Sequence, residues 1–390
     1  MSDHRIDDQP PRVLRNAEVV LPDRTALADL VLRGPTIDSL LPPGRGQGVE
    51  VHDLGGRRVT PGLIDLHVHG GWGVDFYRDD AERIASVADR FLASGVTSLL
   101  LTLHTGPIDE MLDRIANAAD ACELSPVFAG IHLEGPFLAR DRKGALPEEG
   151  IHAYDAELLG RIVEAAHGKL RVMTFAPESL PPAALGGLHS LGVGLSIGHT
   201  SSDAAAVRQA IAAGARRCTH LCNAMPPIHH RDPGPIVELL LDDRVRVEVI
   251  PDGRHLDDRV LEMILRLKGP DRVIAVSDAM PLAGLGAAAG SFCGQEVQTD
   301  GERATLADGT LAGSVTFLPE ALARTASALQ LSPSRLVSLG CTAAAQDLGL
   351  PRTGRIGSGG RADLVVWEDG RAQATLRGGE GELPPEWRIA

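Results

Sequence analysis

The stretch GLIDLHVHG, at residues 62–70, decides how the fold is understood. It begins with apolar residues and then places His67 and His69 two positions apart. Because side chains alternate between the two faces of a strand, both imidazoles point the same way. Such a pair is a weak sign of a metal site by itself, since neighbouring histidines also occur in turns. Its meaning depends on whether other buried strands of the chain also end in metal-competent side chains.

Seven more apolar segments follow this one, and amphipathic helical stretches lie between them. Strands are expected at 62–68, 96–103, 127–134, 170–178, 192–199, 217–222, 245–252 and 272–279. Helices are expected at 79–94, 155–168, 201–214, 256–268 and, after the eighth strand, 319–330. Near-continuous apolar strands that alternate with helices predict a closed (β/α)8 barrel of the TIM type rather than an open sheet.

Short strand-like segments broken by Gly-rich turns fill the first sixty residues and return at residues 354–379. This pattern is typical of a small β-domain assembled from both ends of a chain. We therefore expect a β-domain at 1–60 and 346–390 and a barrel at 61–345. Two Asp-Gly turns predict a β-hairpin-like insertion at about 288–313, within the barrel.

The overall composition excludes several classes of protein. With 390 residues, of which 43% are hydrophobic and 23% charged, the chain has the composition of an ordinary soluble globular protein. No run of about 18 apolar residues occurs, and the stretch MSDHRIDDQPPRV is polar, so we expect neither a membrane span nor a signal peptide. A net charge of −14 argues against nucleic acid as a partner. Five scattered cysteines suit reduced thiols in the cytoplasm better than a disulfide framework.

Metal-competent side chains stand at the carboxyl ends of five of the expected strands. In a barrel these ends meet at one rim, which is where the chemistry of such folds takes place. A lone residue of this kind is usually a loop or capping residue, but six at one rim together predict a metal site. The six residues are His67, His69, Glu134, His199, His220 and Asp278.

Two further histidines lie close to this set. His132 precedes Glu134 by two positions, and we expect it to hydrogen-bond around the ligands rather than to bind metal. His104, which follows the second strand, is expected to be a loop residue or to have a similar supporting role.

The ligand types indicate what the site does. Histidine and carboxylate without cysteine are typical of a catalytic divalent metal, with Zn²⁺ expected first and Fe²⁺, Mn²⁺ or Co²⁺ also compatible. Such a metal lowers the pKa of bound water to about 7 and polarises a carbonyl oxygen. Asp278 is placed to accept the proton of the attacking water and to pass it to a leaving nitrogen. The sequence therefore predicts a hydrolase acting on an amide bond.

The motifs resemble those of the N-acetylglucosamine-6-phosphate deacetylase family, within the amidohydrolase superfamily. The similarity extends over nearly the whole chain, and HLEGPF at 132–137 and THLCNAMPPIHHRDPG at 219–234 are its most specific parts. It implies a β-sandwich built from both termini, a barrel and a homodimer. It also implies metal-dependent removal of an acetyl group from a small amino-sugar phosphate.

The resemblance also assigns roles to single residues. Glu134, His199 and His220 match the family's primary metal ligands, and Asp278 matches its acid/base residue. Further positions match residues that contact the sugar phosphate, with Ala224 acting through its backbone N–H. They are Ala145, Leu146, Asn223, Ala224, Arg231, His255, Leu311, Ala312 and Gly313. In the family, residues matching Arg231 and His255 can reach the site of the partner subunit, and the cluster HHRDPG is locally basic, as phosphate binding requires.

Leu146 departs from the family pattern. The family usually has a histidine or glutamine at this place, whereas the loop here reads RKGALPEEG. An unpaired buried sugar hydroxyl costs about 1–3 kcal/mol. Either another group supplies the contact, or the substrate differs at that hydroxyl, as it would in N-acetylgalactosamine 6-phosphate or in an unphosphorylated sugar.

Two other functions are disfavoured by the residues present. Cyclic amidases of this superfamily bridge two metals with a carbamylated lysine at a strand end, and none of Lys143, Lys169 and Lys268 is placed there. A non-catalytic assembly protein would lack ligands or the acid/base residue, whereas all of them are present here. Since Glu134, His199 and His220 suffice for one ion, His67 and His69 predict a second, weaker metal position.

Overall fold

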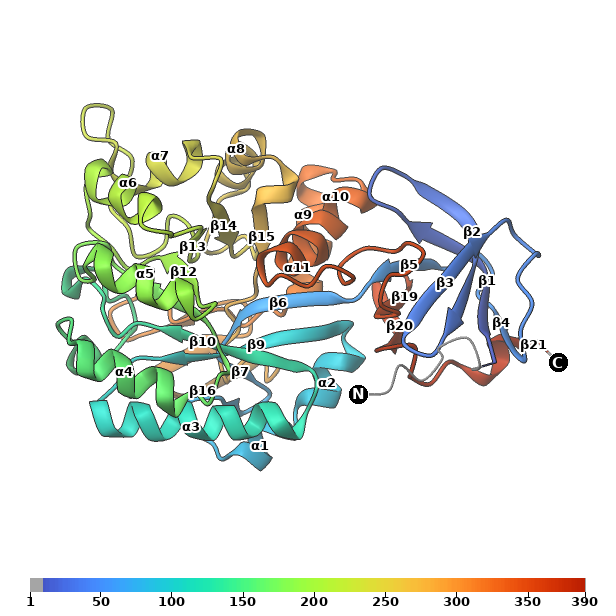
Figure 1. Cartoon of the computed structure of the whole chain (residues 1–390), viewed down its shortest axis with the longest axis horizontal. Helices are drawn as coiled ribbons and strands as arrows, with labels where there is room; N and C mark the ends of the chain where they lie inside the picture. Colours follow the sequence, from blue (N-terminus) through green and yellow to red (C-terminus); the bar gives the residue numbers. More distant parts are fainter. Residues whose placement is uncertain (1–9, 390) are drawn as a thin grey trace. The chain divides into compact units, whose positions relative to one another are not determined.

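The computed structural model describes residues 10–389. The polar stretch MSDHRIDDQPPRV, for which we expect no signal peptide, lies mostly outside the described residues. Eight parallel strands form one sheet in which each strand neighbours the next along the chain (Figure 1). They are β6 (Leu63–Val68), β9 (Val96–His104), β10 (Phe128–Glu134), β11 (Leu170–Phe175), β12 (Gly194–Ile197), β13 (Arg217–Cys218), β14 (Arg246–Val249) and β15 (Val273–Ala275).

The sheet closes between its first strand and the segment after its last. Val68 pairs in parallel with Ala279, the N–H of Asp278 donates to the carbonyl of His67 at 2.9 Å, and the N–H of His69 donates to the carbonyl of Ala279 at 2.8 Å. All nine residues of β9 are buried, as expected for a strand with apolar contacts on both faces. The predicted barrel is confirmed.

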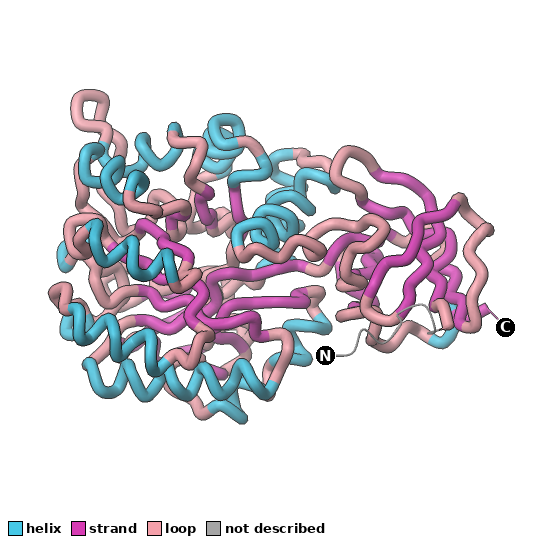
Figure 2. Tube along the Cα trace, in the orientation of Figure 1, coloured by secondary structure: helices cyan, strands magenta, loops and turns pink. Residues whose placement is uncertain are grey.

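Helices cover the outside of the barrel strands (Figure 2). They are α1 (Ala81–Ala85), α3 (Ile108–Leu124), α4 (Ala156–Ala165), α5 (Pro182–Ser190), α6 (Ala204–Ala212), α7 (Gly234–Leu241), α8 (Asp258–Lys268) and α9 (Leu318–Leu329). Asp155, Asp203 and Asp257 begin three of them, each accepting a backbone N–H of the first turn at 2.8 Å.

The single helix expected at 79–94 is a wrong prediction. The chain forms α1 and then α2 (Ala88–Ala93), because Ser86 ends the first helix. The Ser86 hydroxyl donates to the carbonyl of Arg83 at 2.6 Å, which satisfies a backbone group that a continuing helix would use.

The two ends of the chain share one sheet of eight strands. Its main order is β20-β19-β5-β1-β2-β3, and β4 pairs with both β1 and β21. The strands are β1 (Arg12–Val20), β2 (Thr25–Arg33), β3 (Thr36–Leu41), β4 (Glu50–Asp53), β5 (Arg58–Pro61), β19 (Leu364–Glu368), β20 (Arg371–Leu376) and β21 (Arg388–Ile389). Leu14, Leu30, Leu364 and Trp387 belong to the core of this part. The predicted small β-domain from both termini is thereby confirmed as part of the fold class.

The described residues divide into two compact units. One contains the residues up to Ile64, Asp89–Ser98 and the residues from Gln330 onward, and the other contains Asp65–Ala88 and Leu99–Leu329. The first includes α10 (Pro333–Val337), a π-helical turn at Ser338–Thr342 and α11 (Ala343–Asp347). The boundaries proposed at residues 60 and 345 remain predictions.

Three short strands follow the barrel where an insertion is expected. They are β16 (Ala287–Phe292), β17 (Gln295–Asp300) and the two-residue β18 (Ala304–Thr305), paired in that order. Cys293 and Gly294 join the first two through a turn in which both residues have positive φ, 51° and 74°. A buried apolar cluster contains Phe292, Val297 and Leu146.

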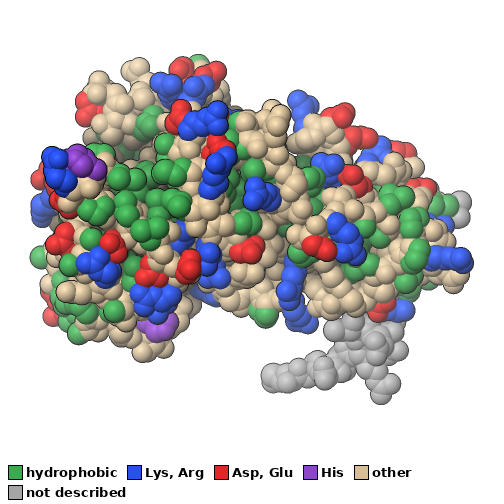
Figure 3. All heavy atoms as spheres, turned by 90° about the horizontal axis from the view of Figure 1, so that it is seen from above, with side chains coloured by type: hydrophobic (Ala, Val, Ile, Leu, Met, Phe, Trp, Pro, Cys, Tyr) green, Lys and Arg blue, Asp and Glu red, His purple; other side chains and the backbone are tan. Residues whose placement is uncertain are grey.

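Two features bear on possible partners. On the face drawn in Figure 3, basic and acidic side chains are interspersed. Within residues 10–389, no helix has both the length and the apolar character that crossing a bilayer requires. All five cysteines are free thiols.

Candidate active site

Three of the predicted ligands lie just beyond their strands on loops with unusual backbone geometry. β12, β13 and β15 end before His199, His220 and Asp278, whose φ angles are 47°, 26° and 51°. Residues other than glycine rarely adopt positive φ, and where they do so the surrounding structure holds them there, often at functional sites. The expected strands at 192–199, 217–222 and 272–279 are therefore too long, because the chain leaves the sheet to turn these side chains inward.

Glu134 ends β10 and contacts two histidines through one carboxylate oxygen. Its Oε1 atom lies 2.9 Å from His199 Nε2 and 3.0 Å from His220 Nε2, and these two nitrogens are 3.2 Å apart. All three side chains are buried and form one group of potential metal ligands.

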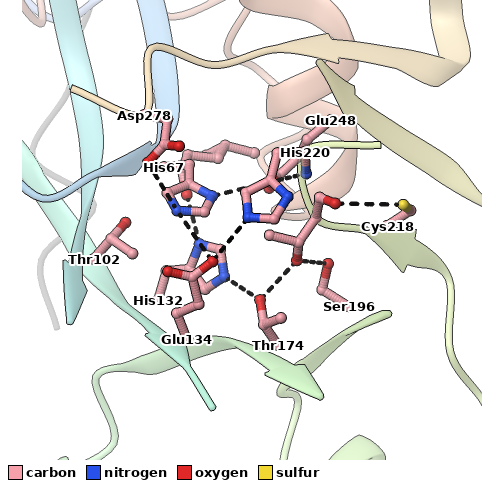
Figure 4. A network of polar contacts seen from close by, with 12 residues as sticks. His67, Thr102, His132, Glu134, Thr174, Ser196, Cys218, His220, Glu248 and Asp278 are labelled. Atoms are coloured by element: carbon pink, nitrogen blue, oxygen red, sulfur yellow. Dashed lines mark hydrogen bonds and ion pairs between the residues drawn. The ribbon is translucent and has the colours of Figure 1, made fainter. Parts of the chain in front are cut away.

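The H-x-H pair forms a second group beside Glu134, in which His69 faces the other carboxylate oxygen and His67 Nε2 lies 3.8 Å from Oε1. His67 Nε2 and His69 Nε2 are 3.2 Å apart, and His69 Nε2 lies 3.5 Å from Glu134 Oε2. Asp278 Oδ1 lies 3.4 Å from His67 Nε2 and 3.3 Å from His69 Nε2. Glu134 thus bridges the two groups. Figure 4 shows Asp278 on the other side of His67 from Glu134.

The donor set fits a divalent metal. Two ligands that bind zinc at about 2.0–2.1 Å in tetrahedral geometry lie roughly 3.3 Å apart. The ligand atoms of Glu134, His199 and His220 are separated by 2.9–3.2 Å. Nitrogen and carboxylate oxygen ligands without thiolate are those of catalytic zinc, iron, manganese or cobalt sites.

Electrostatics in the cluster favour charged forms of its members. Burial alone would raise the pKa of Glu134, but His199 and His67 outweigh it and hold that pKa well below its usual range. The pKa of Asp278 is also lowered, by His67 and His69 against the effect of burial. Burial opposes protonation of His69 and His220, but the facing carboxylates raise the pKa of His69 to about 10 and that of His220 to about 9.

His132 forms hydrogen bonds through both of its ring nitrogens, and His104 through one. His132 Nδ1 donates to the carbonyl of Leu66 at 3.0 Å, and its Nε2 lies 2.8 Å from the Thr174 hydroxyl. His104 Nδ1 donates to the carbonyl of Thr105 at 2.7 Å, and its ring stacks on Tyr77. Burial lowers the pKa of His132 to about 3 and that of His104 to about 4, so both rings are neutral at pH 7.

A cavity of about 240 Å³ lies against the ligand cluster. The predicted metal ligands that line it are His69, Glu134, His199, His220 and Asp278, whereas His67 is completely buried beneath them. The predicted substrate contacts that line it are Ala145, Leu146, Asn223, Ala224, His255, Leu311 and Gly313. The roles of these residues remain predictions, but the barrel brings them together around one space.

Two predicted substrate contacts lie away from this cavity. Ala312 is fully buried in the apolar cluster of the insertion. Arg231 is exposed, and its Nη1 atom lies 2.7 Å from His230 Nε2. His255, in contrast, lines the cavity of its own chain, where its Nδ1 lies 2.8 Å from Asp252 Oδ2.

Sequence reasoning missed Gly144, Phe292 and Thr310, which also line the cavity. Phe292 carried no signal, since an apolar residue in a short strand is usually core. Sequence reasoning also missed Glu248 on β14, whose carboxylate contacts His67. A single acidic residue within the apolar run VRVEVI was a signal that something must neutralise it.

Comparisons with known proteins agree with this geometry. The sequence profile of the Amidohydrolase family matches residues 58–382. N-acetylglucosamine-6-phosphate deacetylase from Homo sapiens is 35% identical, over 95% of this chain and 95% of its own length. N-acetylgalactosamine-6-phosphate deacetylase from Escherichia coli O157:H7 is 30% identical, over 83% of this chain and 86% of its own.

A solved structure is similar over the same extent. It shows an aspartate-to-alanine mutant of N-acetyl-D-glucosamine-6-phosphate deacetylase from Mycobacterium smegmatis in complex with N-acetyl-D-glucosamine-6-phosphate. It superposes with a TM-score of 0.87 at 30% identity, covering 95% of this chain and 99% of that one. The chain therefore belongs to the amidohydrolase family and, within it, to the N-acetylglucosamine-6-phosphate deacetylases.

Proposed function

We propose that this chain hydrolyses the acetamide of N-acetyl-D-glucosamine 6-phosphate to glucosamine 6-phosphate and acetate. The observation that carries the proposal is the bridging position of Glu134 between two histidine pairs, with Asp278 opposite, at the cavity. The names of the human relative and of the Mycobacterium smegmatis structure support the choice of substrate.

Glu134, His199 and His220 would hold one divalent ion, and His67, His69 and Asp278 with the other oxygen of Glu134 a second, weaker one. Zn²⁺ suits this donor set first. When bound, a divalent metal lowers the pKa of water to about 7 and polarises the acetyl carbonyl.

Asp278 would move the proton. Its lowered pKa keeps the carboxylate ionised at neutral pH, which is the form that accepts a proton from water attacking the acetyl carbon. The carbon–nitrogen bond then breaks, and Asp278 returns the proton to the leaving amine. Water is consumed, and acetate and the free amino sugar are formed.

The phosphate would bind at the loop after β13. Ala224 has a positive φ of 51°, and the neighbouring Asn223 donates its side-chain N–H to the carbonyl of His220 at 3.2 Å. Arg231 does not line the cavity of its own chain, which supports a homodimer in which it reaches the phosphate in the partner's cavity. A cytoplasmic location stays a prediction.

Arg231→Ala tests the phosphate contact. We expect it to raise KM for the 6-phosphorylated sugar at least tenfold, since charge-assisted hydrogen bonds are worth about 1.5–3 kcal/mol, and to change little for the unphosphorylated sugar. Equal effects on both sugars would contradict the assignment. A chain that is monomeric by light scattering would contradict the homodimer.

A second candidate is the same reaction on N-acetylgalactosamine 6-phosphate. Leu146 lines the cavity yet belongs to a buried apolar cluster, so it offers no hydrogen bond to a sugar hydroxyl. The Escherichia coli relative carries that substrate in its name. A deacetylation screen of phosphorylated and free N-acetylhexosamines, with metal content measured on the same sample, decides between the two sugars. Absence of acetate release from every one of them would contradict the proposed function.

A further inference from the structure

Glu248 is a buried acid that the proposed reaction does not use. It stands in the middle of β14, and its side chain is completely inaccessible to solvent. An isolated buried carboxylate is costly, so its position requires compensating partners. Figure 4 shows it beside His220.

The two oxygens of Glu248 have different partners. Arg217, which begins β13 and is also buried, donates to Oε1 from Nη2 at 2.6 Å and from Nε at 3.1 Å. His67 Nδ1 lies 3.2 Å from Oε2, and the backbone N–H of His220 points to the same oxygen at 3.4 Å. Arg217 thus neutralises the acid and orients it, while its other oxygen faces the histidine.

This contact determines which nitrogen of His67 carries hydrogen. An ionised carboxylate only accepts hydrogen bonds, so Nδ1 of His67 must be the donor. The lone pair is then on Nε2, the atom that lies 3.2 Å from His69 Nε2 and 3.4 Å from Asp278 Oδ1. His69, by comparison, has no hydrogen-bond partner for Nδ1 among the described residues.

His67, His132 and Glu248 are also close enough to resemble a metal site of their own. Their donor atoms are already engaged, however. His132 uses both ring nitrogens in hydrogen bonds, and Glu248 has the guanidinium of Arg217 beside it, which would repel a cation. The group therefore acts as support for the ligands.

We propose that Glu248, held by Arg217, is a positioning residue that fixes His67 in the tautomer and orientation needed for the metal position formed by His67, His69 and Asp278. The proposal rests on the two metal positions of the proposed function. Partners of this kind on ligating histidines typically change metal affinity by about 10–100-fold.

Two variants test it, Glu248→Gln and the double variant Arg217→Met with Glu248→Leu. Glutamine keeps the shape but presents an amide to Arg217. The double variant replaces the buried ion pair by apolar groups, an exchange that is often neutral for stability. The matched control is Asp363→Asn, because Asp363 is a buried acid in the other unit of the chain whose two oxygens share the Nε–H of Arg361, at 2.8 and 2.9 Å.

The readout is Zn²⁺ bound per chain after equilibrium dialysis against buffered zinc. The parent and Asp363→Asn are expected to bind two ions. In both Glu248 variants the weaker affinity should fall about 10–100-fold, while the tighter one stays unchanged. Unchanged weaker affinity in the folded variants, loss of both ions together, or a parent that binds one ion would each overturn the proposal.

A measurement on the unmodified chain covers the case in which the variants fail to fold. Histidine-selective ¹⁵N NMR of the zinc-loaded protein should show His67 protonated at Nδ1, assigned by the signal lost in His67→Gln. Protonation at Nε2 would overturn the proposal.

Acetate release by the parent protein is measured separately. Deacetylation with one bound ion would contradict this inference alone, and two ions without deacetylation would contradict the proposed function alone.

Discussion

At the scale of single residues, the positions of two carboxylates organise the site. Glu134 divides its oxygens between the two histidines in the loops after β12 and β13 and the histidine His69. Asp278 faces His67 and His69 from a left-handed backbone position that a strand could not provide. Glu134 therefore bridges the two ligand groups, and Asp278 is the residue proposed to move a proton.

Asp278→Asn tests that division of roles. Asparagine keeps the size of the side chain but cannot accept and return a proton, so kcat should fall about 100- to 10,000-fold. The ion held by Glu134, His199 and His220 should remain bound, which metal analysis of the same sample checks. Turnover close to that of the parent would show that Asp278 does not transfer the proton.

Leu146→His tests the departure from the family pattern. A histidine at the cavity wall could hydrogen-bond the sugar, and a contact worth about 1 kcal/mol would raise kcat/KM for N-acetylglucosamine 6-phosphate about fivefold. The melting temperature should fall, because Leu146 packs in a buried apolar cluster. An unchanged kcat/KM would mean that another group already makes this contact.

At the scale of elements, the loops that follow the strands position the site. The loop after β10 fixes a ligand directly, since His199 Nδ1 donates to the carbonyl of Arg142 at 2.7 Å. The loop after β14 is held by Asp252, which accepts the backbone N–H of Arg254 and of His255 and the hydroxyl of Ser314 at 2.8–3.0 Å.

Asp252→Asn should therefore weaken folding in a pH-dependent way. Burial opposes ionisation of Asp252, but His255 and the backbone N–H groups lower its pKa from 3.8 to about 2. A lowered folded-state pKa gives stability that is fully present above about pH 4 and is lost as the pH falls toward 2. The shift corresponds to about 2 kcal/mol. Urea unfolding of parent and variant should differ by this amount at pH 7 and by about half of it at pH 3, and an equal difference at both pH values would contradict the assignment.

The sequence was sufficient for the eight barrel strands and for expecting the predicted ligands at one rim, for a physical reason. Every predicted ligand lies at the carboxyl end of a buried strand or just after it, and the carboxyl ends of parallel barrel strands meet at one rim, so order along the chain implies proximity. Side-chain contacts between neighbouring strands, whose residues are far apart in the sequence, could not be predicted in this way. Glu248 and Arg217 are 31 positions apart, and only the register of β13 with β14 brings them together.

The ends of elements were also beyond prediction. Nothing in the residues of β13 shows that it stops at Cys218, since the apolar pattern continues past it. The turns at His199, His220 and Asp278 depend on tertiary contacts that hold positive φ angles. The same holds for Phe292, which reaches the cavity only because the insertion folds back onto it.

At the scale of the whole molecule, metal binding and folding should be coupled. Histidine and carboxylate ligand atoms are collected in one buried cluster, and an ion that binds them only in the folded chain stabilises that state. Removing a metal present at about 100 times its Kd costs about 2.7 kcal/mol.

Chelation should therefore lower the melting temperature by about 3 °C, because an unfolding entropy of about 2.1 cal/mol/K per residue corresponds to about 1.2 °C per kcal/mol for a chain of this length. Restoring Zn²⁺ should restore the melting temperature and the activity together. Differential scanning calorimetry before and after dialysis against a chelator checks this, and a melting temperature that is indifferent to metal would contradict the coupling.

The measurement that tests the central claim most directly is product formation from N-acetyl-D-glucosamine 6-phosphate by the metal-loaded chain. Acetate and glucosamine 6-phosphate should appear in equal amounts, and Glu134→Gln, which removes the bridging carboxylate, should abolish both. Failure of the metal-loaded parent to release acetate from this substrate, or full activity of Glu134→Gln, would contradict the account.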